Sequence, residues 1–294
     1  MDNKCTMFNW DDLRVFLAVA REGSVRGAAK KIGKTHATVS RHIRCLGVDL
    51  HGPLFERRRE GQCLTDLGRR ILPLAEQVEK NVAAVDRTAF SADTGLAGSV
   101  TLSLSESLYV ALLYKPLDDF MSHYPMINLN IIATDNLSSL GWREADVVIR
   151  ITRAPPESAF GKKIADSPLA VYTSRKYLEN RPVRDRWISL TYEPARKPSI
   201  PARIVASADT PALAAQMIRL GQGVGILPCY IGDTDPEIIR MPDTELIPDM
   251  QMWVLTHEDI RTNPRVRSLM DHLYDAFVEY RTIIEGKGKN EALV

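Results

Sequence analysis

Apolar residues recur every three to four positions in the first fifty residues, a spacing that predicts three amphipathic helices. The range 11–21 predicts the first helix. The range 24–46 predicts a pair of shorter helices joined by a tight turn at Gly33, with Ser24 and Thr35 as their N-caps. The inward positions of this pair are Val25, Ala28, Ala29, Ile32, Val39, Ile43 and Leu46.

The outward face of the third helix carries short polar and cationic side chains, among them His42. Such side chains reach base edges and phosphates when a helix lies in the major groove and a second helix braces it across the backbone. The alternative is an ordinary helical pair with a solvated basic face. The candidate DNA-binding residues of the pair are Ser24, Thr35, His36, Ala37, Thr38, Ser40, Arg41 and Arg44.

Three consecutive arginines follow the helical pair. Arg57, Arg58 and Arg59 precede a turn at Glu60-Gly61, and the flanking residues predict a short β-hairpin. Arginines beside a groove-reading helix would contact phosphates or the minor groove, so all three are candidate DNA contacts. The alternative is a solvated charge run.

A long helix is predicted from Thr65 to about Phe90. Its apolar positions form a near-heptad stripe, which a lone helix cannot bury within a small domain, so we expect it to pair with a second copy of the chain. Pro73 lies within its first turns, and the range 91–99 predicts a hinge. The stripe consists of Leu67, Ile71, Leu74, Val78, Val82 and Val85.

From residue 98 onward, short apolar strands alternate with helical patterns. The ranges 99–105, 127–135 and 145–152 predict strands, and the range 263–284 predicts a final helix. Alternation of this kind is typical of an α/β domain with mostly parallel sheets.

Polar residues cluster where these predicted strands end, which is where ligands bind in open α/β sheets. Hydroxyls, backbone amides and one guanidinium would suit a small anion such as a carboxylate. The alternatives are that the serines are plain helix caps and that Arg150 pairs with Asp135 or Asp146. The candidate effector-binding residues are Ser105, Glu106, Ser107, Thr134, Arg150, Thr152, Ser207, Asp209 and Thr210.

Charge is distributed unevenly along the 294 residues. Residues 1–60 hold 12 Lys and Arg against 7 Asp and Glu, whereas the remainder carries a net charge of −4. A basic end on a mildly acidic body is typical of a polyanion-binding module. The N-terminus carries no secretory signal pattern, and no apolar run is long enough to span a membrane.

The sequence offers no recognisable catalytic or metal-binding constellation. His123, His257 and His272 are isolated from any nucleophile motif, and no phosphate-binding glycine loop is present. The four scattered cysteines, which include Cys45, form no close pair and predict buried thiols in a reducing compartment. We therefore expect a protein that is not an enzyme and has no cofactor and no metal.

Several motifs together resemble LysR-type transcriptional regulators: FLAVAREGS, the Ala28-Ala29 pair, TVSRHI, LFERR and LTDLG. The resemblance runs through essentially the whole chain. It implies a winged helix-turn-helix over 1–64, a linker and dimerisation helix with hinge over 65–97, and a periplasmic-binding-protein-like effector domain over 98–294. Subdomain I would comprise about 98–166 and 257–284, and subdomain II about 167–256. The sequence departs from the family at Thr35-His36-Ala37, at Leu46-Gly47 and at Leu50-His51-Gly52-Pro53.

These observations predict a cytoplasmic, sequence-specific transcriptional regulator. Its expected partners are double-stranded DNA, a small anionic effector, further copies of itself in a homodimer or homotetramer, and RNA polymerase, with no membrane. The alternative is a solute-binding protein or an enzyme of the same α/β fold, whose N-terminal part serves only for oligomerisation.

Overall fold

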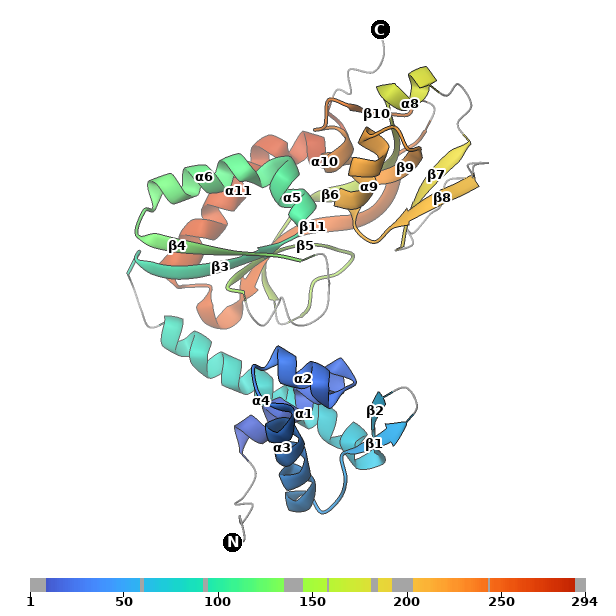
Figure 1. The fold of residues 1–294 in the computed structure, drawn as a ribbon. Coiled ribbons are helices and arrows are strands. Elements are labelled where there is room, and N and C mark those ends of the chain that lie inside the picture. The colour runs from blue at the N-terminus through green and yellow to red at the C-terminus, as the bar shows by residue number, and fades with distance from the viewer. Residues whose placement is uncertain are drawn as a thin grey trace. The chain divides into compact units, whose positions relative to one another are not determined.

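The computed structural model divides the chain into two compact units, residues 1–87 and 88–294 (Figure 1). It describes residues 9–58, 61–91, 95–134, 145–157, 159–180, 185–191, 203–242 and 244–288. The predicted class, a helix-turn-helix domain followed by an α/β domain, is confirmed.

Three helices form the core of the first unit: α1 (Trp10–Glu22), α2 (Val25–Lys31) and α3 (His36–Asp49). Phe16 and Leu46 are fully buried in one apolar cluster of this unit, and Val39 is fully buried in a second. The predicted inward faces are therefore confirmed. Asn9 and Asp12 start α1 with a reciprocal capping box, in which each side chain accepts a hydrogen bond from the other's backbone N–H.

The predicted hairpin follows as β1 (Phe55–Arg58) and β2 (Gly61–Leu64), paired antiparallel. The amide of Gln62 donates a hydrogen bond of 2.9 Å to the carbonyl of Gly23, where α1 ends. Gly61 has φ of +128°, and a Cβ there would lie 2.7 Å from the same carbonyl oxygen. A glycine is therefore required for the hairpin to lie this close to α1.

The long helix α4 spans Asp66–Ser91 and contains Pro73. The hydroxyl of Thr65 accepts a hydrogen bond from the amide of Gly68 and so caps the start of this helix. The predicted stripe divides along the helix. Leu67 and Ile71 pack on the core of the first unit, whereas its exposed members are Leu74, Val78 and Val85.

The second unit is built on one continuous sheet, whose described strands run in the order β4-β3-β5-β11-β6-β9-β7-β8, with β10 beside β6. The strands are β3 (Gly98–Leu104), β4 (Ile127–Ala133), β5 (Val147–Thr152), β6 (Ala159–Ser174), β7 (Arg186–Leu190), β8 (Arg203–Ala208), β9 (Val224–Pro228), β10 (Ile238–Arg240) and β11 (Ile247–His257). The helical segments are α5 (Glu106–Leu108), η1 (Tyr109–Leu113), α6 (Tyr114–His123), α8 (Arg175–Asn180), α9 (Pro211–Arg219), α10 (Cys229–Gly232), η2 (Glu258–Ile260) and α11 (Pro264–Ile284).

The sheet is mixed, so the expectation of mostly parallel strands is wrong. β3 pairs parallel with β4 and β5, and β7 pairs parallel with β8 and β9, but β6 and β11 are antiparallel to their neighbours. β6 pairs with β11 along its first part and with β9 near its end, so these two long strands join two lobes. Lobe I is built around β3–β5, and lobe II around β7–β9.

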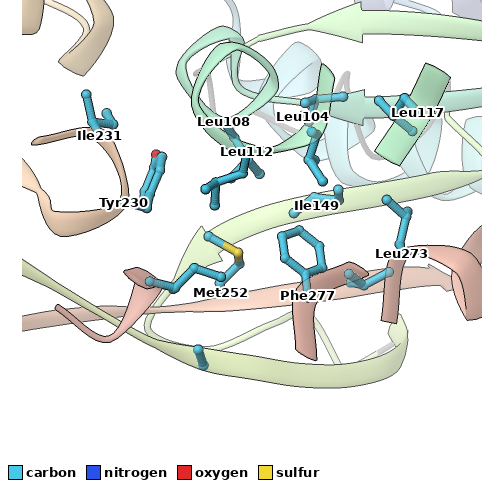
Figure 2. Close-up of a cluster of buried hydrophobic side chains, with 14 of the residues drawn as sticks. Leu104, Leu108, Leu112, Leu117, Ile149, Tyr230, Ile231, Met252, Leu273 and Phe277 are labelled. Atoms are coloured by element: carbon cyan, nitrogen blue, oxygen red, sulfur yellow. The ribbon is translucent and has the colours of Figure 1, made fainter. Parts of the chain in front are cut away.

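The core of the second unit continues through both lobes (Figure 2). Leu104, Leu108 and Ile149 come from lobe I, whereas Tyr230 and Ile231 come from α10 in lobe II. Because these side chains belong to one buried cluster, a change at the boundary between the lobes must alter apolar packing as well as polar contacts.

The helical segment after β3 contains a π-helical turn, η1, which the sequence pattern did not predict. The sequence pattern also did not indicate β7, β10 or the first part of β6, in which most positions are exposed or half-buried. Thiol chemistry differs too: Cys45 is disulfide-bonded, whereas Cys63 and Cys229 are free. Distance along the chain did not reveal this bond, because a disulfide depends on proximity in space.

No helix in the described ranges has the length and apolarity to cross a bilayer.

Candidate functional site

The candidate DNA-binding residues of α3 lie on its outward face. Thr35 caps the helix, because its hydroxyl accepts a hydrogen bond of 3.2 Å from the amide of Thr38 and lies 2.8 Å from the Thr38 hydroxyl. His36, Ala37, Arg41 and Arg44 are exposed, and Thr38 and Ser40 are half-buried. Ser24 caps α2 by accepting a hydrogen bond of 3.0 Å from the amide of Gly27.

The two cations of this face are available for a partner. Within the described residues, neither Arg41 nor Arg44 forms an ion pair. They lie three positions apart on α3, so their side chains lie on the same side of the helix. A charged, unpaired row of this kind can bind the phosphate backbone or the edges of bases.

His42 departs from the sequence analysis, which placed it on the outward face. Its Nδ1 lies 2.6 Å from Oδ1 of Asp12, and both side chains are largely buried. A carboxylate can only accept a hydrogen bond, so Nδ1 of His42 donates it. The ring therefore fastens α3 to the start of α1 and serves as a positioning residue for the outward face.

Asp11 adds a second link between the helices. Lys34, in the turn before α3, pairs with Asp11, and Nε2 of His42 lies 3.9 Å from the same carboxylate. The hydrogen bond from Lys34 holds the pKa of Asp11 below its usual value, and burial opposes this effect.

The arginines of the hairpin are only partly described. Arg57 pairs with Gln62 and Arg58 with Gly61 in the β1–β2 register. The side chains of Arg57 and Arg58 lie outside the described part of the structure, and so does the whole of Arg59. Their proposed contact with phosphates therefore rests on sequence and on the existence of the hairpin.

A cavity of about 230 Å³, hereafter the first cavity, lies between the two lobes of the second unit. It brings together five of the predicted effector-binding residues: Ser105, Ser107, Thr134, Arg150 and Asp209. The remaining wall is mostly apolar, as is common in ligand pockets. The other lining residues are Leu108, Ile149, Ile151, Pro211, Pro228, Tyr230 and Met250.

The other four predicted effector-binding residues do not line the first cavity. Glu106 and Thr210 line a second cavity of about 590 Å³, also between the lobes. Thr152 donates a hydrogen bond of 3.1 Å to the carbonyl of Ala154, and Ser207 is exposed on β8. Thr210 caps α9, since its hydroxyl accepts a hydrogen bond of 3.2 Å from the amide of Leu213.

Polar groups of the first cavity are held by hydrogen bonds. The Ser105 hydroxyl accepts a hydrogen bond from the amide of Leu108 and lies 3.2 Å from the Ser107 hydroxyl, which lies 3.3 Å from that of Tyr230. Arg150 donates to Oγ of Ser103 at 2.8 Å, which fixes the direction of its guanidinium. Asp209 is exposed at the start of α9.

The apolar wall and Tyr230 could not be recognised as parts of a site from the sequence. Tyr230 lies two residues after the end of β9 and is 1% exposed, but its sequence neighbours predict only a buried strand and a turn. A signal was present in Pro228, which ends the predicted buried strand, because ligands in open α/β sheets bind beyond the carboxyl ends of strands. The lining residues on β5 look like core from their apolar pattern alone.

Cys229, beside Tyr230, is not a candidate reactive thiol. It is fully buried, and desolvation raises the pKa of its thiol to about 11. Next to it Asp233 accepts hydrogen bonds from Tyr172 at 2.8 Å and from Nε of Arg240 at 3.2 Å. Burial nevertheless raises the pKa of the Asp233 carboxyl. Within the described residues, no group of three His, Cys, Asp or Glu side chains could hold a metal ion.

Known protein families match both units. Residues 10–69 match the bacterial regulatory helix-turn-helix protein, lysR family, and residues 93–278 match the LysR substrate binding domain. The second match alone covers more than half of the chain.

Individual proteins agree with these matches. The chain is 22% identical over 286 residues to the probable HTH-type transcriptional regulator LtrA of Klebsiella pneumoniae, covering 89% of this chain and 93% of that protein. It is 28% identical over 149 residues to the HTH-type transcriptional regulator MetR of Haemophilus influenzae, where the match spans 50% of this chain and 48% of that protein. The full-length structure of AphB, a Vibrio cholerae virulence activator and LTTR family member, has a TM-score of 0.58 at 19% identity, covering 93% of this chain and all of that chain. This structural likeness shows a shared fold.

Proposed function

The chain belongs to the LysR family of bacterial transcriptional regulators, and we propose that it reads specific DNA sites through α3 and responds to a small ligand in the first cavity. The observation that carries this proposal is the outward row of α3, which presents Arg41 and Arg44 from a packed three-helix core. The matched order of domains supports a regulator, and nothing in it supports the alternative of a transport protein or enzyme.

In DNA binding, each part of the first unit has a separate task. His36, Ser40 and Arg41 would face base edges, where a bidentate arginine distinguishes guanine. Ser24, Thr35 and the hairpin arginines would contact phosphates, which fixes position but carries no sequence information. Two copies would then read half-sites about 10 bp apart or at multiples of that spacing.

Self-association would use the exposed part of the α4 stripe. Leu74 and Val85 are 63% and 69% exposed, and Val78 lies between them on the same helix. Large apolar side chains along one helical stripe are covered when two such helices pair. We propose a homodimer or homotetramer on this basis, with Leu67 and Ile71 contributing to the fold of the first unit.

The ligand would be small, because the first cavity of about 230 Å³ lies below the usual range for drug-sized molecules. Its wall combines apolar side chains with hydroxyls, one arginine and one aspartate. A molecule with an apolar body and a single carboxylate or hydroxyl fits this chemistry. Asp209 would repel a ligand with several negative charges.

The remaining partners follow from the role as a regulator. The protein would act in the cytoplasm, where double-stranded DNA and RNA polymerase are found. There it would alter the access of polymerase to promoters. Ligand binding would change the geometry of the DNA-bound oligomer rather than catalyse a reaction.

Genome-wide capture of DNA by the purified full-length protein at physiological salt tests the proposal. We expect a few sharp peaks that share a spaced inverted repeat. The Arg41→Ala variant should lose these peaks, while Arg267→Ala, the same charge change at an exposed side chain of α11, should retain them. Diffuse retention that disappears with salt, equal for all three proteins, would contradict sequence-specific reading.

A further inference from the structure

One buried hydrogen bond joins the two lobes at the first cavity. The hydroxyls of Ser107, on α5 in lobe I, and Tyr230, on α10 in lobe II, lie 3.3 Å apart. The side chains are 5% and 1% exposed, so solvent does not compete for this contact. Figure 2 shows Tyr230 with its hydroxyl oxygen in red, in the same cluster as Leu108 and Leu112.

Ser107 lies at the boundary between the first cavity and the second cavity. It lines both the first cavity and the second cavity, whereas Tyr230 lines only the first and Ile231 only the second. The Ser107–Tyr230 contact is therefore part of the wall between them. Any movement that separates the two hydroxyls would reshape both cavities.

The contact is weak enough for a ligand to replace. Hydrogen bonds between hydroxyls are usually about 2.5–3.0 Å long, so a separation of 3.3 Å is longer than usual and marks a weak bond. A ligand carboxylate in the first cavity could accept a shorter, charge-assisted bond from the Tyr230 hydroxyl. A ligand hydroxyl could take the same place as a neutral partner.

The segment after Ser107 has a geometry suited to movement. The π-helical turn η1 begins at Tyr109, directly after α5. Such turns interrupt the regular helical hydrogen bonds and are frequent at functional sites. Val110 and Tyr114, in and just after this turn, line the second cavity and are 65% and 49% exposed. A shift of α5 would therefore also displace these exposed side chains.

We propose that the Ser107–Tyr230 hydrogen bond is a latch that holds the two lobes in the ligand-free arrangement, and that a ligand opens it by taking the Tyr230 hydroxyl. Tyr230 is then a specificity-determining residue, which favours ligands with one carboxylate or hydroxyl on an apolar body. This inference rests on the proposed function, because opening of the latch must be read out as a change in DNA binding.

The test uses the full-length protein on a DNA site captured from the genome, with no ligand added. Four variants are compared with the wild type: Ser107→Ala, Tyr230→Phe, the double variant, and Tyr177→Phe. The last is a matched control, since Tyr177 is also buried and its hydroxyl donates to Asp185 at 3.3 Å, away from both cavities. DNA bending by fluorescence transfer and thermal stability are measured for each.

With the latch closed and with the latch open, the protein would bend its DNA site to two different degrees. Both single variants should shift the ratio of these two bent states about two- to tenfold in the same direction, the population change that one hydrogen bond can support. The double variant should shift it no further than either single variant. Tyr177→Phe should lose thermal stability without a shift in bending.

Unchanged bending in Ser107→Ala and Tyr230→Phe, or additive shifts in the double variant, would overturn the latch while sequence-specific binding by the wild type remains intact. A wild-type protein that captures no specific site would instead overturn the proposed function, so the two failures are distinguishable.

Discussion

The outward face of α3, hereafter the reading face, and the first cavity are assembled in different ways. Seven of the eight candidate DNA-binding residues before the hairpin lie within Thr35 to Arg44, at the cap and on one face of α3. The first cavity collects residues from Ser105 to Met250, on β5, α9, α10 and other elements. A local helical pattern can specify the first kind of site, whereas only the tertiary fold specifies the second.

The largest effect is expected when one aromatic core residue is removed from each unit in turn. Phe16→Ala should destabilise the first unit by about 3–5 kcal/mol, and Phe277→Ala should do the same to the second, because each leaves a cavity in a packed core. Calorimetry of the full-length protein should show a different unfolding transition shifting in each variant. A single transition that moves equally in both would mean that the two units unfold together.

A substitution of His42 tests whether the reading face depends on the hydrogen bond that links α3 to Asp12 of α1. His42→Ala removes a hydrogen bond to a carboxylate, which should cost the first unit about 1.5–3 kcal/mol of unfolding free energy. Affinity for all DNA sites should fall together, with unchanged base preference, since the ring holds α3 rather than reading bases. Binding selections with randomised sites provide the measurement, and an altered base preference would place His42 in direct contact with DNA.

Arg41 tests direct reading from the same helix. Arg41→Ala should cost about 1–3 kcal/mol in affinity for the preferred site and relax selectivity at one or two base positions. Titration of matched and mismatched duplexes measures both quantities. Arg41→Ala should leave thermal stability unchanged because the side chain is exposed and has no partner among the described residues. Loss of folding would show that the guanidinium supports the core.

The contrast also explains what could be predicted from the sequence. Periodicity predicted α1, α2, α3 and α4, and the hydroxyls of Ser24 and Thr35 predicted the N-caps of α2 and α3, because an apolar stripe and a capping hydroxyl are local features. It misplaced His42, whose partner Asp12 lies thirty positions away. Tyr230 was missed for the same reason, since only the fold brings it to Ser107. The mixed sheet was missed because strand direction depends on the path of β6 and β11 between the lobes.

His51 provides a smaller test within the loop that follows α3. Among the described residues with positive φ, it is the one that is not glycine, at φ of +59°. His51→Gly should stabilise the first unit by about 0.5–1 kcal/mol, since relief of left-handed strain exceeds the added freedom of the unfolded chain. His51→Ala retains the Cβ and should bring no such gain. Equal stability of the two variants in urea unfolding would contradict this explanation.

The smallest expected effect concerns Asp11 and acid. The hydrogen bond from Lys34 lowers the pKa of this carboxyl below 3.8, so its contribution to stability is present above that value and is lost as pH falls through the lower folded-state pKa. Because the Asp11 side chain is 41% exposed, solvent screens the pair and the contribution should be only about a few tenths of a kcal/mol. Asp11→Asn should therefore be slightly less stable than the wild type at pH 6, and the difference should shrink progressively as the pH falls below 3.8. Asp66→Asn, at a carboxylate that is 94% exposed, provides the control and should show a smaller difference at pH 6. If the Asp11→Asn difference instead persisted in acid, the loss would come from packing or helix capping, and the Lys34–Asp11 pair would not help to hold α3 in place.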